Sequence, residues 1–103
     1  MLLTVTLNAS VDKLYLLEKN TLGTVMRVRE TRNSAGGKGI NVSRVAAQLG
    51  ESVTAMGFVG GHTGQYFEAL LTQQGITHAF TPVAAEMRNC INCWDLSLGQ
   101  STE

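Results

Sequence analysis

The sequence predicts an α/β fold in which the strands of a largely parallel sheet alternate with helices. Short apolar runs of strand length alternate with two segments in which apolar residues recur at helical spacing. A glycine-rich stretch precedes each helical segment and a glycine follows it, at the places where the chain must turn. The 103 residues, of which 44% are hydrophobic, suffice for one packed core and are too few for two.

The first strand is expected at residues 2–7, where Leu3, Val5 and Leu7 alternate with a second, partly apolar set that suits a buried strand. Beyond a short run of turn-forming residues, two extended segments are expected at 11–17 and 25–31. Their polar character suits an exposed flap more than a core.

The first helix is expected directly after the first glycine-rich stretch, and Gly50 ends it. Its apolar face consists of Val42, Val45, Ala46 and Leu49. A near-continuous apolar run at 53–59 predicts a buried strand, and a second helix follows and ends at Gly75. The apolar face of that helix consists of Tyr66, Phe67, Leu70 and Leu71. Residues 76–83 and 89–96 predict two more strands.

Charge and hydropathy exclude several classes of partner. Eight Lys and Arg residues balance eight Asp and Glu residues, so no overall field favours nucleic acid or an anionic membrane. One stretch with a single acid, Glu30, nevertheless holds five basic residues that would attract an anion: Arg27, Arg29, Arg32, Lys38 and Arg44. No apolar run reaches the roughly 20 residues that cross a bilayer, and no leader sequence is visible. The protein is expected to be soluble and cytoplasmic.

Cys90 and Cys93 have the spacing of redox and zinc motifs. The residues around them alternate as in a strand, which would point the two thiols to opposite faces and disfavour a disulfide or a shared metal. Only His62 and His78 could complete the four ligands of a zinc site. We expect two ordinary thiols and no metal site.

Residues 35–41, with the sequence Ala-Gly-Gly-Lys-Gly-Ile-Asn, are the most informative stretch of the chain. Their glycines would let a ligand approach backbone N–H groups at a helix start. A Walker A loop would need Gly where Arg32 stands and Ser or Thr where Gly39 stands, and the dinucleotide-binding glycine pattern fails at Val42. The stretch is either an anion-binding loop or a turn that only joins a flap to a helix.

Three side chains near predicted turns could bind a ligand, and each also has an ordinary structural explanation. Asn41 has poor helix propensity, yet it stands beside the glycine loop, where its amide could meet a ligand hydroxyl. Asp12 lies just after the first strand, at the edge where α/β sheets bind ligands, although Asp is also common in turns. Arg88 is either a phosphate contact or a solvated charge.

Four motifs occur in order along the chain. They are T-L-N-A-S-V-D at 6–12, A-G-G-K-G-I-N-V-S-R-V at 35–45, G-F-V-G-G-x-x-G at 57–64 and R-N-C-I-N at 88–92. Together they resemble the PfkB, or ribokinase-like, carbohydrate kinases, and are most similar to the branch that contains 1-phosphofructokinase and tagatose-6-phosphate kinase. One departure is Ala9, which stands where the family usually has Pro.

The resemblance implies a ribokinase-like three-layer α/β fold. Residues 1–103 would form its amino-terminal part, with a small β flap, or lid, at about 11–33. The resemblance also implies a substrate-binding role for seven residues. These are Asp12, Gly36, Gly37, Lys38, Asn41, Arg88 and Arg27. Asp12 and Asn41 would bind the sugar. The backbone amides of the two glycines would bind its phosphate together with Lys38 and Arg88. Arg27 would lie on the flap that covers the sugar.

The resemblance further implies a parent enzyme that uses ATP and Mg²⁺ to phosphorylate a ketohexose phosphate, either fructose 1-phosphate or tagatose 6-phosphate, to the bisphosphate. The family's catalytic Asp, its anion hole and its ATP pocket would lie beyond Glu103, so the chain alone is expected to bind no cofactor and to be inactive. Uncovered sheet surface would favour a homo-oligomer or other self-association. The alternatives are a free-standing sugar-phosphate-binding or assembly module without catalysis, or a kinase for another sugar or a nucleoside.

Overall fold

The computed structural model describes residues 1–103 and contains seven strands and two helices. In chain order these are β1 (Leu2–Thr6), β2 (Ser10–Leu17), β3 (Glu30–Gly36), α1 (Lys38–Gln48), β4 (Val53–Val59), α2 (Gly61–Gln73), β5 (His78–Pro82), β6 (Arg88–Asp95) and β7 (Gln100–Thr102). Neither helix is long and apolar enough to cross a membrane. The strands belong to two separate sheets.

The first sheet is parallel, with the strand order β1-β4-β5. α1 packs on β1 and β4, and α2 contacts β4 and β5 as well as β2 and β3. The core between helices and strands includes the fully buried side chains of Phe67, Ile40 and Leu71. Phe80 meets Phe67 edge to face, with 5.1 Å between the ring centroids. The predicted alternation of strands and helices is therefore confirmed.

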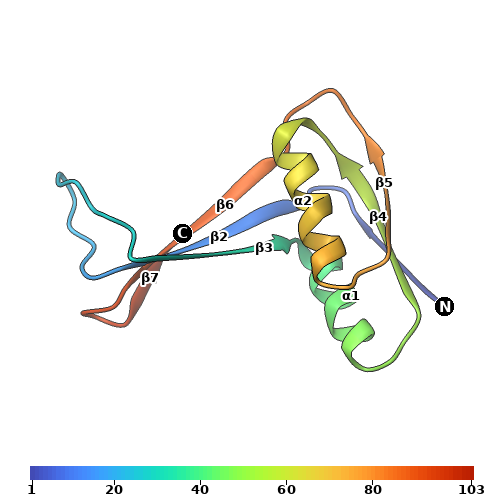
Figure 1. Cartoon of the computed structure of the whole chain (residues 1–103), viewed down its shortest axis with the longest axis horizontal. Helices are drawn as coiled ribbons and strands as arrows, with labels where there is room; N and C mark the ends of the chain where they lie inside the picture. The colour runs from blue at the N-terminus through green and yellow to red at the C-terminus, as the bar shows by residue number, and fades with distance from the viewer.

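The second sheet, which we call the lid, has the order β3-β2-β6-β7. β2 pairs antiparallel with β3 and parallel with β6. Figure 1 shows the lid extending away from the parallel sheet as a long, narrow blade. The sequence assigned only about 11–33 to the flap. The structure adds β6 and β7, because the chain returns from β5 to pair along the second edge of β2.

The strand expected at residues 25–31 is wrong over residues 25–29. Residues 18–29 form the loop at the far tip of the lid, and β3 begins only at Glu30 (Figure 1). The bounds of β3 follow from its pairing with β2, which runs from Leu16 opposite Glu30 to Ser10 opposite Gly36. The start of the predicted glycine loop is therefore the end of a strand, and a single residue separates it from α1.

Asp95, the last residue of β6, ties the loop at the tip of the lid to the turn that leads into β7. Its carboxylate accepts hydrogen bonds from the backbone N–H groups of Ser97, Leu98 and Asn20 and from the Ser97 hydroxyl. The Ser97 hydroxyl and the Asn20 N–H lower the pKa of Asp95 below its ordinary value. One charged side chain thus holds together the two chain segments at the outer end of the lid.

The prediction of the buried face of α1 is wrong, because three of the residues expected there are more than half exposed: Val42, Val45 and Leu49. The helix instead packs Ile40 and Ser43 on the sheet. The Ser43 hydroxyl lies 2.6 Å from the Thr4 hydroxyl and 2.9 Å from the carbonyl oxygen of Gly39, which accepts its hydrogen bond. Small side chains at this contact let helix and sheet approach closely, and close packing decides the orientation.

The face of the parallel sheet opposite the helices is bare. Leu3, Val5 and Leu7 are 57%, 63% and 67% exposed, whereas Thr4 and Thr6 are buried under α1. The expectation of a fully buried first strand is therefore wrong. Only the threonine face of β1 is covered.

Candidate functional site

Asp12 projects from β2 toward the end of β3. The fully buried hydroxyl of Ser10 donates a hydrogen bond of 2.6 Å to Asp12 Oδ1. The carboxylate lies so close to Gly36 that a Cβ at that position would overlap it. Asp12 is thus held by a hydrogen bond on one side and by a backbone without a side chain on the other, which leaves Oδ2 to accept a hydrogen bond from a ligand.

The N-terminus of α1 follows directly after Gly36, the residue against which this carboxylate lies. Gly37 is the N-cap of the helix, and its φ of 126° is one that residues with a side chain rarely adopt. No side chain caps the helix, and its first turn holds no acid. The first helical hydrogen bond runs from the N–H of Asn41 to the carbonyl oxygen of Gly37, so the N–H groups before it remain available, beside the exposed Lys38, to an anion.

The N-terminus of α2 differs because the protein fills it with its own carboxylate. Glu86 Oε1 accepts a hydrogen bond of 2.7 Å from the N–H of Thr63. This backbone hydrogen bond and the Thr63 hydroxyl lower the pKa of Glu86 below its ordinary value. Gly61 leaves room for the carboxylate, since a Cβ there would overlap it. Of the two helix starts, only that of α1 is open to a ligand anion.

Arg88 joins the site through strand register. Ser10 is paired with Gly36 on one side and with Arg88 on the other, so the arginine lies two strands from the glycine, about 10 Å away. Its side chain is exposed, and Nη2 donates to the carbonyl oxygen of Asn8 at 3.2 Å. Asn8 and Arg88 both border a pocket of about 180 Å³ that lies beyond the carboxyl ends of β1 and β4.

Asn41 lies in the first turn of α1 and its side-chain oxygen is already engaged. Arg44 Nη1 donates to Asn41 Oδ1 at 3.0 Å, while Nη2 donates to the carbonyl oxygen of Ala35 at 2.6 Å. The amide nitrogen of Asn41 has no such partner and is the atom that could donate to a ligand. Two guanidinium N–H groups of Arg44 therefore hold the loop and the Asn41 amide in place.

The cluster of basic residues expected from the sequence is dispersed. Arg29 pairs with Glu18 and Arg32 with Glu30, each at 3.1 Å. Arg27 lies in the loop at the tip of the lid, beyond the end of β2, and the length of β2 alone places it on the order of 20 Å from the glycines. The Asp12 carboxylate lies against Gly36, which Gly37 and Lys38 follow in the chain, and Arg88 lies two strands away. Asn41 lies in the first turn of α1, and Arg27 lies far from all of them.

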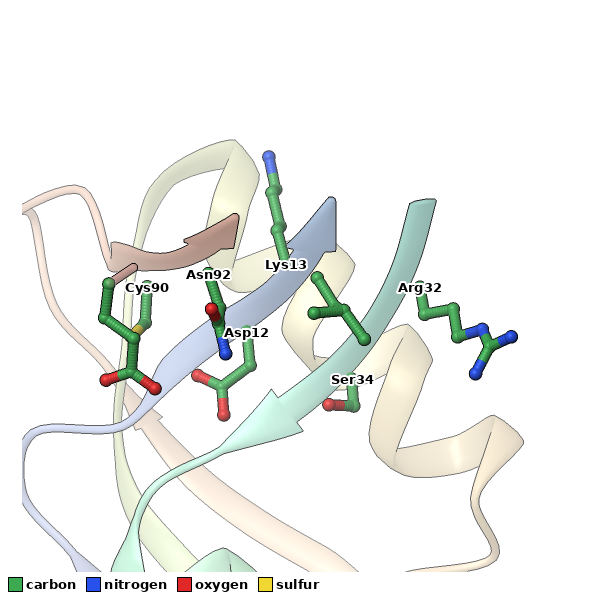
Figure 2. A pocket seen from close by; sticks show the side chains of 8 residues that line it. Asp12, Lys13, Arg32, Ser34, Cys90 and Asn92 are labelled. Carbon is green, nitrogen blue, oxygen red and sulfur yellow. The ribbon is translucent and has the colours of Figure 1, made fainter. Parts of the chain in front are cut away.

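A second pocket of about 180 Å³ opens on the lid face that carries Asp12. It is lined by Asp12, Lys13, Leu14, Arg32, Ser34, Cys90, Asn92 and Glu103. Figure 2 shows the side chains of Asp12, Ser34, Cys90 and Asn92 gathered around the same space on the lid strands. Within the register, Asp12 stands opposite Ser34 on one side and Cys90 on the other.

Sequence reasoning missed Ser34, Cys90 and Asn92 as members of the site. Nothing in their local spacing points to Asp12, because only the pairing of β2 with β3 and β6 brings them beside it. Cys90 and Cys93 are both free thiols and stand three residues apart on β6, and only Cys90 lines the pocket. The expected placement of the two thiols on opposite faces agrees with this arrangement.

The arrangement is suited to binding a polyhydroxylated anion. Asp12 and Asn41 can exchange hydrogen bonds with hydroxyl groups, while the α1 N-terminus, Lys38 and Arg88 favour a phosphate group. No three His, Cys, Asp or Glu side chains are grouped so that they could hold a metal ion. The site therefore presents the elements of ligand recognition.

The profile of the pfkB family carbohydrate kinase matches residues 5–99. Tagatose-6-phosphate kinase of Staphylococcus epidermidis is 50% identical over 103 residues, which are all of this chain and 33% of that protein. Phosphofructokinase-2 of Escherichia coli in complex with fructose 6-phosphate superposes with a TM-score of 0.91 at 28% identity, over 98% of this chain and 33% of that one. A possible 1-phosphofructokinase of Thermotoga maritima gives a TM-score of 0.87 at 36% identity, over 99% and 33%.

The chain thus spans about a third of the length of the relatives it matches. The shared architecture confirms the predicted ribokinase-like α/β fold with a small β lid. Because the family profile covers nearly the whole chain, membership does not depend on the glycine motif alone. The chain belongs to the pfkB family of carbohydrate kinases.

Proposed function

We propose that this chain forms the sugar-phosphate-binding side of a kinase that converts a ketohexose phosphate, fructose 1-phosphate or tagatose 6-phosphate, to the bisphosphate. The observation that carries the proposal is the Asp12 carboxylate, which is packed on Gly36 beside the uncapped start of α1. A hydroxyl acceptor next to an anion site fits a phosphorylated sugar. The relatives named for tagatose-6-phosphate and fructose-phosphate kinases support the same substrate class.

Each site residue has a role in this proposal that follows from its chemistry. Asp12 accepts hydrogen bonds from sugar hydroxyls, and the amide nitrogen of Asn41 donates one. The backbone amides at Gly36 and Gly37 bind the phosphate together with Lys38 and Arg88. Arg27 would contact the ligand only if the tip of the lid came toward the glycine loop.

ATP and Mg²⁺ would supply the transferred phosphoryl group and neutralise its charge. No three His, Cys, Asp or Glu side chains in the chain are grouped so that they could hold a metal ion. We propose that residues 1–103 are the amino-terminal part of the kinase domain, with the lid contributing β2 and β3, and that other residues of the parent enzyme hold the nucleotide and the catalytic base. The chain alone would then show no phosphoryl transfer.

The two cysteines provide a test of binding that needs no catalysis. Cys90 lines the pocket that contains Asp12, whereas Cys93 does not. Fructose 1-phosphate or tagatose 6-phosphate should slow alkylation of Cys90 by iodoacetamide and leave Cys93 unchanged, as measured by peptide mass spectrometry over time. The sugar that protects at the lower concentration identifies the preferred substrate.

Asp12→Ala is the matched variant, since it removes the hydroxyl acceptor and leaves both thiols in place. It should abolish the protection of Cys90. Unphosphorylated fructose and inorganic phosphate serve as ligand controls, and each should protect far less than the sugar phosphate. Equal alkylation rates with and without both sugar phosphates would contradict the proposal.

A further inference from the structure

Thr6, the last residue of β1, is buried against the start of α1. The two glycines on either side of Lys38 both close on its side chain. A Cβ at Gly39 would overlap Thr6 Oγ1, and a Cβ at Gly37 would lie only 2.7 Å from Thr6 Cγ2. The two branches of this one side chain therefore fill the space between β1 and the first residues of the helix.

The backbone of Thr6 is held as closely by the neighbouring strand. Register places Thr6 beside Gly57 of β4, and a Cβ at Gly57 would overlap the carbonyl oxygen of Thr6. A β-branched side chain is also restricted in its rotation about χ1. Thr6 is therefore a fixed support between the parallel sheet and the start of α1.

The hydroxyl group of Thr6 contributes its shape and no hydrogen bond. Oγ1 is buried and has no hydrogen-bond partner in the protein. Thr4, two residues earlier on β1, differs, because its hydroxyl lies 2.6 Å from the hydroxyl of Ser43, farther along α1. Since a buried hydroxyl without a partner is unfavourable, valine at position 6 would keep the support at no cost, whereas alanine would remove it.

We propose that Thr6 is a positioning residue for the phosphate group of the substrate, because it sets the height at which the open N–H groups at the start of α1 stand above the sheet. The inference rests on the proposed function, in which the phosphate binds at Gly36, Gly37 and Lys38. Hydrogen bonds to a phosphate require donors at defined positions. Without the support, those N–H groups would be mobile, and the ligand would have to order them on binding.

Titration of the ¹⁵N-labelled chain with inorganic phosphate, fructose 1-phosphate and tagatose 6-phosphate tests this role, with the backbone signals of Gly37 and Lys38 as the readout. Thr6→Ala should raise the Kd of inorganic phosphate and that of the preferred sugar phosphate by the same factor, roughly three- to tenfold, because the loss lies at the phosphate end. Thr6→Val, which keeps the shape of the side chain, should retain the affinity.

Gly39→Ala tests the same contact from the side of the helix and removes no atom from the core. Gly39 belongs to α1 and has no positive φ, so its backbone accepts alanine and the overlap with Thr6 Oγ1 is the obstacle. The substitution should displace the start of the helix and raise both Kd values. In the double variant Thr6→Ala/Gly39→Ala the new methyl group occupies part of the vacated space, and much of the affinity should return.

Thr4→Ala is the matched control, because Thr4 is buried under the same helix but contacts Ser43 in place of the glycines. It should lower the free energy of unfolding and leave every Kd unchanged.

A folded Thr6→Ala chain with unchanged Kd values would overturn the role of Thr6 alone, and so would a Thr6→Val chain that loses as much affinity as Thr6→Ala. A wild-type chain whose Gly37 and Lys38 signals move with neither inorganic phosphate nor the sugar phosphates contradicts the proposed function, and the role of Thr6 then falls with it.

Discussion

The position of the Asp12 carboxylate depends on the missing side chain of Gly36. The three atoms nearest to a Cβ built on Gly36 all belong to that carboxylate. Ser10 holds the same group from the other side through its buried hydroxyl. A methyl group at Gly36 would therefore displace the proposed hydroxyl acceptor while leaving the strand backbone acceptable to alanine.

Gly36→Ala should destabilise the chain by about 1 kcal/mol or somewhat more, the cost of overpacking a close contact. The cost should largely disappear when Asp12 is already alanine, because the overlapping atoms are then absent. Urea unfolding of the wild type, both single variants and the double variant gives the coupling free energy directly. If the two substitutions instead change the free energy of unfolding additively, the cost of the methyl group at Gly36 does not come from overlap with Asp12.

Asp12, Gly36, Gly37 and Lys38 could be predicted as site residues because each belongs to a motif that is local in sequence. Asn92 also belongs to a local motif, at 88–92, but only the parallel pairing of β6 with β2 shows that it lines the same pocket as Asp12. Residue types and spacing indicate what a segment can bind. They do not indicate which distant segment will lie beside it.

The two helices begin in the same way in sequence, with a glycine at the N-cap and no acid in the first turn. Tertiary structure separates them, because Glu86 caps α2 by accepting a hydrogen bond from the N–H of Thr63, and no side chain caps α1. The proposed phosphate site therefore depends on one helix start being left open while the other is filled.

Glu86→Gln should lower the free energy of unfolding at pH 7 but have little effect at pH 3. The hydrogen bonds from Thr63 lower the pKa of Glu86 in the folded state. Its stabilising contribution is therefore fully present above the unfolded-state pKa, about 4.3, and is lost as the pH falls through the lower folded-state value. Urea titrations of both proteins at the two pH values measure this difference.

Glu18→Gln is the control for that experiment, because Glu18 is exposed and forms only a surface ion pair with Arg29. Its effect at pH 7 should be small. A Glu86→Gln chain that is as stable as the wild type at pH 7, or that loses as much stability at pH 3 as at pH 7, would contradict the capping role.

Element order was predictable from the sequence, but two details of packing were not. The pairing of β3 with β2 sets the bounds of β3 and prevails over the apolar pattern around Val25 and Val28. The buried face of α1 was misjudged because Ser43 and Thr4 form a hydrogen-bonded contact that brings helix and sheet together. In both cases a tertiary contact prevailed over the local hydrophobic pattern.

The whole chain has helices on only one face of its parallel sheet. The other face exposes Leu3 and Val5 of β1, Leu7 just after it and, from β4, Met56 and Phe58. Register places Val5 directly beside Met56, so these side chains form a continuous apolar surface. Parallel sheets are ordinarily covered on both faces, and the relatives, about three times as long, have further chain that could provide the cover. In the 103-residue chain, self-association is the available way to bury this surface.

Sedimentation velocity should therefore show concentration-dependent association of the wild-type chain, and Val5→Lys should shift the equilibrium toward monomer. Val5 is 63% exposed at the centre of the apolar surface, so a lysine there places a charge in the contact without disturbing the core. Val25→Lys is the control, because Val25 is 87% exposed on the loop at the tip of the lid, away from the parallel sheet. It should associate like the wild type. A wild-type chain that remains monomeric at every concentration, or two variants that behave alike, would mean that this sheet face does not drive association.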